Sequence, residues 1–346
     1  MLTLSRQLER QGAAFQDRAP WWGGDLQTLR NVCRPQTAAL PGQSSAMAFP
    51  MSFPMAFPMS DGSGDQLTGT LHRPMSPAKD DPSILLIHGL TGCEDSTYMK
   101  ESALFHLRRG RQVLRLNLRG AGRSRHVANG YYHAGCARDI RDVLDGLDDA
   151  SLERGLVLVG FSLGGNILLN FAGRLAAHYP IAGIATVSAP IEPLEACKRM
   201  MEPRNAVYHR FLLKRMKQDV LSSRILSTGE RKDIEGARSI FAFDDCWVAP
   251  QNGFRDARDY YERTAGARCV RSISVPALLL HASNDPWIPV RPYLSLQKLG
   301  LPNVAIVISR SGGHVGFHER GHAETWHDRM IDIFIKSLVG HEVSAP

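Results

Sequence analysis

A serine set between glycines, in the segment GFSLGG, is the side chain of this sequence best suited to nucleophilic chemistry. Residues 160–164 match the pattern G-x-S-x-G, in which the serine lies on a sharp turn between a strand and a helix. The flanking residues fit that setting, because the apolar run GLVLVGF precedes Ser162 and the helical stretch NILLNFAG follows it. We therefore predict that Ser162 is a nucleophile, and the alternative is a structural turn of small residues.

A serine hydroxyl needs a base to become nucleophilic, and the base needs an acid to fix its tautomer. His314, in SRSGGHVGF, and Asp285, in ASNDPWIP, each follow a predicted buried strand. The chain order Ser162, Asp285, His314 is one of the known orders of a catalytic triad. Asp244 and Asp245 are the alternative acids, and either loop residue of the proposed triad could instead have a purely local role.

The tetrahedral intermediate of such a reaction needs hydrogen-bond donors for its oxyanion. We expect one donor to be the backbone N–H of Leu163, directly after the nucleophile, and the other to be that of Leu90, after the first buried strand. Gly89 before it would allow a close backbone approach, and we expect His88 to orient this loop rather than to act as a base.

Two histidine patterns elsewhere suggest other chemistry. HERGH, at residues 318–322, matches a zinc signature that requires both histidines on one helix face, but Gly321 interrupts it. His327 and Asp332 have the spacing of an acyltransferase motif, but we expect them on the solvated face of the last helix. We therefore predict neither a metal site nor a cofactor.

The elements that must position these residues follow from short apolar runs that alternate with helix-like stretches. Strand, helix and strand repeated in this way predict an α/β fold, with a mostly parallel sheet covered by helices on both faces. The runs are SILLIHG (83–89), QVLRLNL (112–118), GLVLVGF (155–161), IAGIATVS (181–188), PALLLHAS (276–283) and VAIVIS (304–309).

The alternation breaks between about Ile191 and Pro250, so we divide the chain into three parts. Residues 1–60 form an N-terminal arm, 61–190 and 251–346 form the core, and 191–250 form an inserted helical cap. The arm ends in MAFPMSFPMAFPMS, Met47–Ser60, whose prolines exclude a helix or a central strand and leave loop or extended structure.

The composition indicates a soluble globular protein, with 346 residues, of which 43% are hydrophobic and 22% charged. A net charge of +7, without an arginine-rich run or a nucleic-acid motif, argues against nucleic-acid binding. Six scattered cysteines favour free thiols, and the absence of a signal peptide or a long apolar run favours a cytoplasmic location. The sequence indicates no particular oligomeric state.

One cap segment, AVYHRFLLKRMKQDVL, places Tyr208, Leu212, Met216 and Val220 four residues apart on one helical stripe. Two interpretations stay open. The stripe packs against the body of the protein, or the helix is a basic amphipathic lid that makes peripheral contact with a membrane.

Most of the chain resembles the YheT-like branch of the α/β-hydrolases, bacterial relatives of the eukaryotic ABHD lipases. The resemblance is carried by WWGGDLQTL, HGLTGCEDSTYMK, NLRGAGRS, GFSLGGN, ASNDPWIP, GGHVGF and DDCWVAPQNGFRDARDYY. It implies an α/β-hydrolase fold, esterase or lipase-like hydrolysis without a metal, and a triad at the positions of Ser162, Asp285 and His314.

We therefore expect a serine hydrolase that cleaves carboxylic esters with an apolar acyl chain, through an acyl-enzyme. Its expected partner is a small-molecule ester or a lipid. Two alternatives are an acyltransferase that uses the same triad, and a non-catalytic interaction protein on a hydrolase scaffold.

Overall fold

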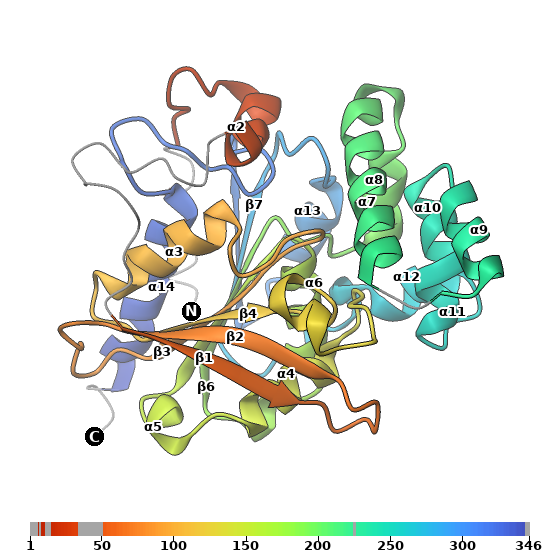
Figure 1. Cartoon of the computed structure of the whole chain (residues 1–346). Helices are drawn as coiled ribbons and strands as arrows, with labels where there is room; N and C mark the ends of the chain where they lie inside the picture. Colours follow the sequence, from red (N-terminus) through yellow and green to blue (C-terminus); the bar gives the residue numbers. More distant parts are fainter. Residues whose placement is uncertain (1–5, 7, 11–14, 34–50, 224–225, 343–346) are drawn as a thin grey trace.

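The computed structural model of this chain describes residues 6, 8–10, 15–33, 51–223 and 226–342. At its centre is one eight-stranded sheet in the order β1-β2-β4-β3-β5-β6-β7-β8 (Figure 1). The strands are β1 Met51–Pro58, β2 Gln66–Arg73, β3 Ser83–Ile87, β4 Val113–Asn117, β5 Leu156–Phe161, β6 Ile181–Val187, β7 Ala277–Ala282 and β8 Val304–Ser309. The pairs β1–β2 and β2–β4 are antiparallel and all others are parallel. The predicted α/β fold is confirmed, since all six predicted runs form strands.

The central strands are buried on both faces, as a sheet covered by helices on both sides requires. In β3, Leu85 and Ile87 belong to one hydrophobic cluster, whereas Ile84 and Leu86 belong to the other. Among the helices beside these strands, two contribute to the first cluster and two to the second. They are α4 Ala137–Asp145 and α6 Leu163–Ala172, then α3 Thr97–Leu107 and α14 Trp326–Glu342.

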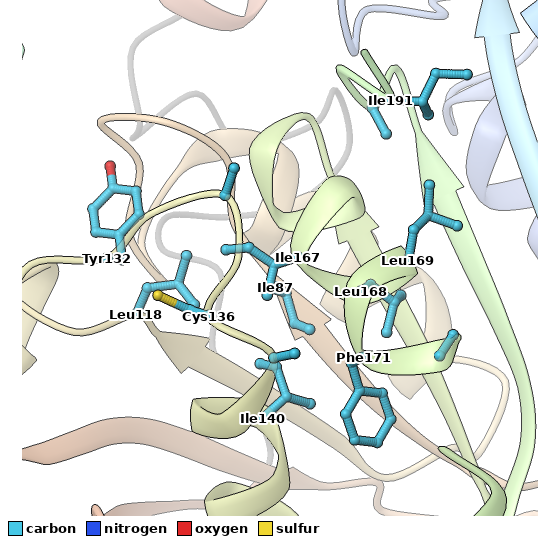
Figure 2. Packing of buried hydrophobic residues seen from close by; sticks show 14 of the residues in the cluster. Ile87, Leu118, Tyr132, Cys136, Ile140, Ile167, Leu168, Leu169, Phe171 and Ile191 are labelled. Atoms are coloured by element: carbon cyan, nitrogen blue, oxygen red, sulfur yellow. The ribbon is translucent and has the colours of Figure 1, made fainter. Parts of the chain in front are cut away.

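Helix α6, which begins directly after Ser162, is held by its packing in the first cluster. Figure 2 shows Ile167 and Phe171 of this helix directed toward Ile87 of β3 and Ile140 of α4. Burying one such side chain contributes about 1.5–3 kcal/mol to folding. The start of the helix, and with it Ser162, is therefore fixed against the end of β5.

The phenylalanine-proline repeat forms the edge of the sheet. Its residues 51–58 are β1, paired only with β2 among the described strands, while residues 47–50 lie outside the described part of the chain. The N–H of Met59 donates to the carbonyl of Asp65. In an antiparallel pair, the N–H groups of every second residue point to the same neighbouring strand, so those of residues 51, 53, 55 and 57 point toward β2. Pro54 and Pro58 occupy the alternate positions, which face away from β2 and need no donor. The extended structure predicted for the repeat is confirmed, and the loop alternative is wrong for these residues.

The segment between β6 and β7 is helical and gathers on one side of the molecule (Figure 1). Its main helices are α7 Pro193–Met200, α8 Ala206–Ser223, α9 Thr228–Gly236, α10 Ile240–Phe243, the π-helical turn η4 Asp244–Val248, α11 Ala249–Gln251 and α12 Ala257–Thr264. Helix α12 also packs against α7 and η4. These contacts cross the predicted boundary at residue 250 without testing it, so the division of the chain at residues 60, 190 and 250 stays a prediction.

Candidate active site

Ser162 lies on the sharp turn between β5 and α6, with backbone angles φ 50° and ψ −121° that a non-glycine residue rarely adopts. The two flanking glycines of the motif are required by this turn. A Cβ on Gly160 would lie 2.6 Å from the carbonyl oxygen of Gly164, and one on Gly164 would lie 2.5 Å from that of His88. The strand and the helix therefore approach each other more closely than any side chain would allow.

The structure brings the three predicted triad residues together. The Nε2 atom of His314 lies 2.9 Å from the Oγ atom of Ser162, and its Nδ1 atom lies 2.9 Å from Oδ2 of Asp285. Asp285 follows β7 and His314 follows β8, so neighbouring parallel strands deliver both side chains to the same edge of the sheet. With Nδ1–H donating to the carboxylate, Nε2 is left to accept the proton of the serine hydroxyl.

Both oxygens of the Asp285 carboxylate accept hydrogen bonds. Its Oδ1 atom accepts hydrogen bonds from the backbone N–H groups of Trp287, at 2.8 Å, and Ile288, at 3.0 Å. Burial raises the pKa of this carboxyl, but His314 and the Ile288 N–H outweigh burial and the pKa lies below its ordinary value. The group is therefore ionised at neutral pH and orients the imidazole.

The ring of Trp287 covers the imidazole of His314, with centroids 4.4 Å apart and an angle of 31° between the planes. It also contacts Tyr208 of α8 at a centroid distance of 5.4 Å. The indole thus connects the helical segment between β6 and β7 to the histidine.

The loop after β3 passes directly beside the serine. A Cβ on Gly89 would lie 2.8 Å from the Cβ of Ser162, so only glycine permits this approach. Among the described residues, no acceptor pairs with the N–H of Leu90, and the N–H of Leu163 begins α6, where no helical carbonyl precedes it. Both predicted oxyanion donors are therefore unpaired beside the nucleophile.

His88 fixes this loop, in the role predicted for it. The N–H of Leu118 donates to its Nε2 atom at 3.1 Å, so its Nδ1–H donates to the carbonyl of Gly89 at 2.8 Å. Burial lowers the pKa of His88 to about 4, which keeps the ring neutral. Its two nitrogens are thereby committed to the backbone, and the ring does not serve as a second base.

The N-terminal arm contributes to the site in a way that the sequence did not predict. Helix α2, Gly23–Cys33, packs against the loop that carries His314 (Figure 1). The Oγ1 atom of Thr28 accepts the backbone N–H of His314 at 2.8 Å. The side chain of Gln27 accepts the N–H of His318 and donates to its carbonyl. The one signal in the sequence was the segment WWGGDLQTL, which contains Gln27 and Thr28 and contributes to the family resemblance.

The HERGH segment lacks the helical geometry that its zinc signature requires. Residues 318–325 are not helical, since α14 begins at Trp326, so the two histidines share no helix face. His318 is buried against the guanidinium of Arg30, at 2.6 Å and 2.8 Å, whereas His322 is exposed. No cluster of metal-binding side chains occurs among the described residues.

The prediction that His327 and Asp332 lie on a solvated face is wrong. Both are buried, because α14 packs against the sheet and also contacts α3, where Ser102 donates to Asp328. The ring of His327 lies 5.5 Å from that of Phe161, and Asp332 pairs with Arg111 at 2.7 Å. Both residues belong to the interior of the fold.

The two alternative acids lie in η4, away from His314. Asp245 is exposed and accepts the N–H of Ala257. Asp244 is buried and accepts a 2.6 Å hydrogen bond from the hydroxyl of Tyr261.

A cavity of about 340 Å³ opens in front of Ser162 and His314. Its wall is mostly apolar and comes from the loop after β3, from α2 and from the helices between β6 and β7. Representative lining residues are Leu90, Tyr132, Met200, Met216, Ile240 and Trp287. Such a volume and lining are typical of small-molecule sites.

Helix α8 uses its predicted stripe to pack inward. Leu212, Met216 and Val220 are buried and Tyr208 is half-buried, as the first of the two interpretations requires. No helix in the described ranges combines the length and the apolar content needed to cross a membrane. Five cysteines of the described chain are free thiols, namely Cys93, Cys136, Cys197, Cys246 and Cys269.

Comparison with known sequences gives one family and several distant relatives. The profile of the Alpha/beta hydrolase family matches residues 84–328. "Phospholipase ABHD3" of Mus musculus is 27% identical over 270 residues, or 76% of this chain and 66% of that protein. "Putative esterase YheT" of Escherichia coli (strain K12) is 29% identical over 245 residues, or 69% and 72% of the two chains. "Medium-chain fatty acid ethyl ester synthase/esterase 2" of Saccharomyces cerevisiae is 26% identical over 282 residues, or 74% of this chain and 62% of that protein. The chain thus spans about two thirds of the length of these relatives.

Solved structures resemble this chain in fold. The Pyrococcus furiosus esterase Pf2001 gives a TM-score of 0.55 at 16% identity, covering 83% of this chain and 92% of that one. The alpha/beta hydrolase GrgF from Penicillium sp. sh18 gives a TM-score of 0.57 at 17% identity, covering 84% of this chain and 99% of that one. At such identities the similarity concerns the fold alone.

Proposed function

This chain belongs to the alpha/beta hydrolase family, in the branch of YheT and the ABHD proteins, and from this premise we propose that it is a serine hydrolase of carboxylic esters. The observation that carries the proposal is the continuous hydrogen-bonded chain from Ser162 through His314 to Asp285 at the floor of an apolar cavity. The names of the relatives, an esterase and a phospholipase among them, support an ester or a lipid as substrate.

In the proposed mechanism, the Oγ atom of Ser162 attacks the ester carbonyl while Nε2 of His314 takes the hydroxyl proton. The N–H groups of Leu90 and Leu163 stabilise the oxyanion, and Asp285 stabilises the imidazolium. The imidazolium gives its proton to the departing alcohol, which leaves an acyl-enzyme. Water, deprotonated by the same imidazole, then releases the carboxylic acid and restores the serine.

The test is covalent labelling with a fluorophosphonate, followed by peptide mapping. We expect the label on Ser162, no labelling of Ser162→Ala, and hydrolysis of p-nitrophenyl hexanoate only by the unmodified protein. A label on another serine, or none on folded protein, would overturn the proposal and favour a non-catalytic interaction protein.

A second candidate function is acyl transfer, and the yeast relative named a synthase/esterase favours it. The same acyl-enzyme would then give its acyl group to an alcohol in place of water. Adding ethanol to the hydrolysis assay distinguishes the two: ethyl ester formed in excess of free acid supports transfer.

We further propose that the face around the cavity mouth makes peripheral contact with anionic lipid surfaces. Val207 and Phe211 of α8 are exposed, and Asp25 of α2 contacts both Arg204 and Tyr208, which brings the two helices together. Between residues 203 and 218 there is no acidic side chain, but there are five basic ones: Arg204, Arg210, Lys214, Arg215 and Lys217. Basic residues beside exposed apolar ones suit a negatively charged lipid interface.

Sedimentation with vesicles tests this contact. We expect the protein to bind phosphatidylglycerol vesicles more strongly than phosphatidylcholine vesicles, and a Val207→Ser, Phe211→Ser double variant to lose that binding. Equal binding by the double variant would exclude this face.

A further inference from the structure

A single buried carboxyl group in the described part of the chain lacks a basic partner, and it lies in the wall of the substrate cavity. Nine acidic side chains are buried there. Eight of them have an arginine or a histidine within salt-bridge distance; they are Asp65, Glu94, Asp139, Asp142, Asp285, Glu319, Asp328 and Asp332. The ninth is Asp244, which lines the cavity that contains Ser162 and His314.

The contacts of Asp244 use only part of its hydrogen-bonding capacity. Its Oδ2 atom accepts the hydroxyl of Tyr261 at 2.6 Å, and the same hydroxyl lies 3.2 Å from the thiol of Cys197. No group of the described chain donates a hydrogen bond to Oδ1. Oδ1 is therefore free to accept a hydrogen bond from a ligand in the cavity, in a wall that is otherwise mostly apolar.

The surroundings oppose its charge. Burial raises the pKa of Asp244 to about 7, against a lowering contribution from the Tyr261 hydroxyl. Most other residues that line the cavity are apolar, Met200, Met216, Ile240 and Val248 among them, and the Tyr261 hydroxyl is the one group that lowers this pKa. In binding cavities of this kind, a few polar groups in an apolar lining fix the orientation of the ligand.

We propose that Asp244, positioned by Tyr261, is a subsite for a hydrogen-bond donor carried by the ester, either a hydroxyl or an ammonium group. This inference rests on the proposed ester hydrolysis and deepens it, since it names a polar group within a largely apolar substrate. A purely hydrocarbon chain would leave the carboxyl oxygen without a partner and displace any water from it. A donor on the substrate restores that hydrogen bond.

Two ester series test the subsite. In the first, p-nitrophenyl esters of straight-chain, ω-hydroxy and ω-amino acids are compared at matched chain lengths. In the second, the same groups are placed on the alcohol, and the acid released is titrated. The quantity measured is the ratio of kcat/KM for each donor-bearing ester to that of its hydrocarbon counterpart.

For the unmodified protein, we expect this ratio to be largest in one series and at one chain length. Asp244→Leu should lower it by about 10- to 100-fold, as for loss of a hydrogen bond to a carboxyl group. Asp244→Asn should retain the preference for hydroxyl over hydrocarbon and lose any preference for ammonium. Tyr261→Phe should lower the ratio less than Asp244→Leu does.

Asp245→Asn and Asp245→Leu, at the exposed neighbour of Asp244, are the matched controls and should leave the ratio unchanged. Should Asp244→Leu fail to fold by circular dichroism, Asp244→Asn alone decides, through its opposite effects on hydroxyl and ammonium esters. An unchanged ratio in folded Asp244 variants in both series overturns the subsite, even if ester hydrolysis stands. Absence of hydrolysis and of Ser162 labelling would instead refute the proposed function.

Discussion

Asp285→Asn is the substitution for which the structure makes the sharpest prediction. The wild-type carboxylate accepts three hydrogen bonds, two at Oδ1 from the N–H groups of Trp287 and Ile288, and one at Oδ2 from His314. An asparagine has one oxygen and one NH₂ group, so it can satisfy only one side. With the amide oxygen toward the two backbone donors, the NH₂ group faces Nδ1 of His314 and forces the tautomer whose Nε2 carries a proton. That tautomer cannot accept the proton of Ser162.

The cost of the opposite orientation sets the size of the effect. Turning the amide oxygen toward His314 would leave two buried N–H groups facing an NH₂ group, at about 1–3 kcal/mol each. A total of about 2–6 kcal/mol corresponds to a factor of roughly 30 to 10⁴ against the productive tautomer. Loss of the charge that stabilises the imidazolium adds to this, and Asp-to-Asn changes in serine triads reach ~10⁴-fold in kcat. We therefore expect kcat to fall by at least about a hundredfold.

Steady-state kinetics with p-nitrophenyl hexanoate measure this loss, with circular dichroism as the check on folding. Asp245→Asn is the control and should stay close to the unmodified protein on this ester, and Asp244→Asn should lose far less than Asp285→Asn. Near-normal turnover by Asp285→Asn would refute the tautomer argument. If Asp245→Asn were inactive at the same time, a different carboxylate would serve the triad.

Further predictions concern the arm, the turn, the buried carboxyl and metals. Thr28→Val leaves the buried N–H of His314 without its acceptor at a cost of about 1–3 kcal/mol, so kcat should fall, and unchanged kinetics would exclude a role for the arm. Gly160→Ala should not fold, because the new Cβ meets a backbone carbonyl at 2.6 Å, whereas Gly229→Ala, with nothing within 4 Å, should melt at or above the wild-type temperature. The pKa of Asp244 is raised from 3.8 to about 7, so the folded protein loses stability as the pH rises through this interval. Relative to the wild type, Asp244→Asn should therefore gain up to about 4 kcal/mol in free energy of unfolding between pH 4 and pH 8, measured as a Tm difference that grows with pH, and a pH-independent difference would contradict the shift. Incubation with EDTA should leave hydrolysis unchanged, and a loss of activity that zinc restores would contradict the absence of a metal.

The sequence predicted Ser162, Asp285 and His314 because each follows a strand that is apolar throughout. In a parallel sheet the carboxyl ends of all strands meet at one edge, so position after a strand already implies spatial proximity. The glycines of the turn added a steric signature that is local in the chain. Information of this kind lies within a few residues of each side chain.

Other parts of the site depend on contacts between distant residues. Gln27 and His318 are 291 positions apart, and nothing in the composition of the arm indicates that it holds the histidine loop. The position of Asp244 depends on the π-helical turn η4, which periodicity does not predict. The prediction for His327 and Asp332 was wrong because α14 packs against a neighbouring helix as well as the sheet, so polar residues that an amphipathic pattern assigns to solvent are buried.

The prolines of β1 also determine what cannot join this sheet. Of the four positions in β1 that face outward, Ser52 and Ala56 carry an N–H group, and Pro54 and Pro58 have none. A strand from another molecule that aligned along this edge would find every second donor missing and could not form a regular ladder. Exposed edge strands are the usual starting points of intermolecular sheet growth and aggregation. The repeat therefore terminates the sheet, and a variant with Pro54 and Pro58 replaced by threonine would expose a complete edge that favours self-association.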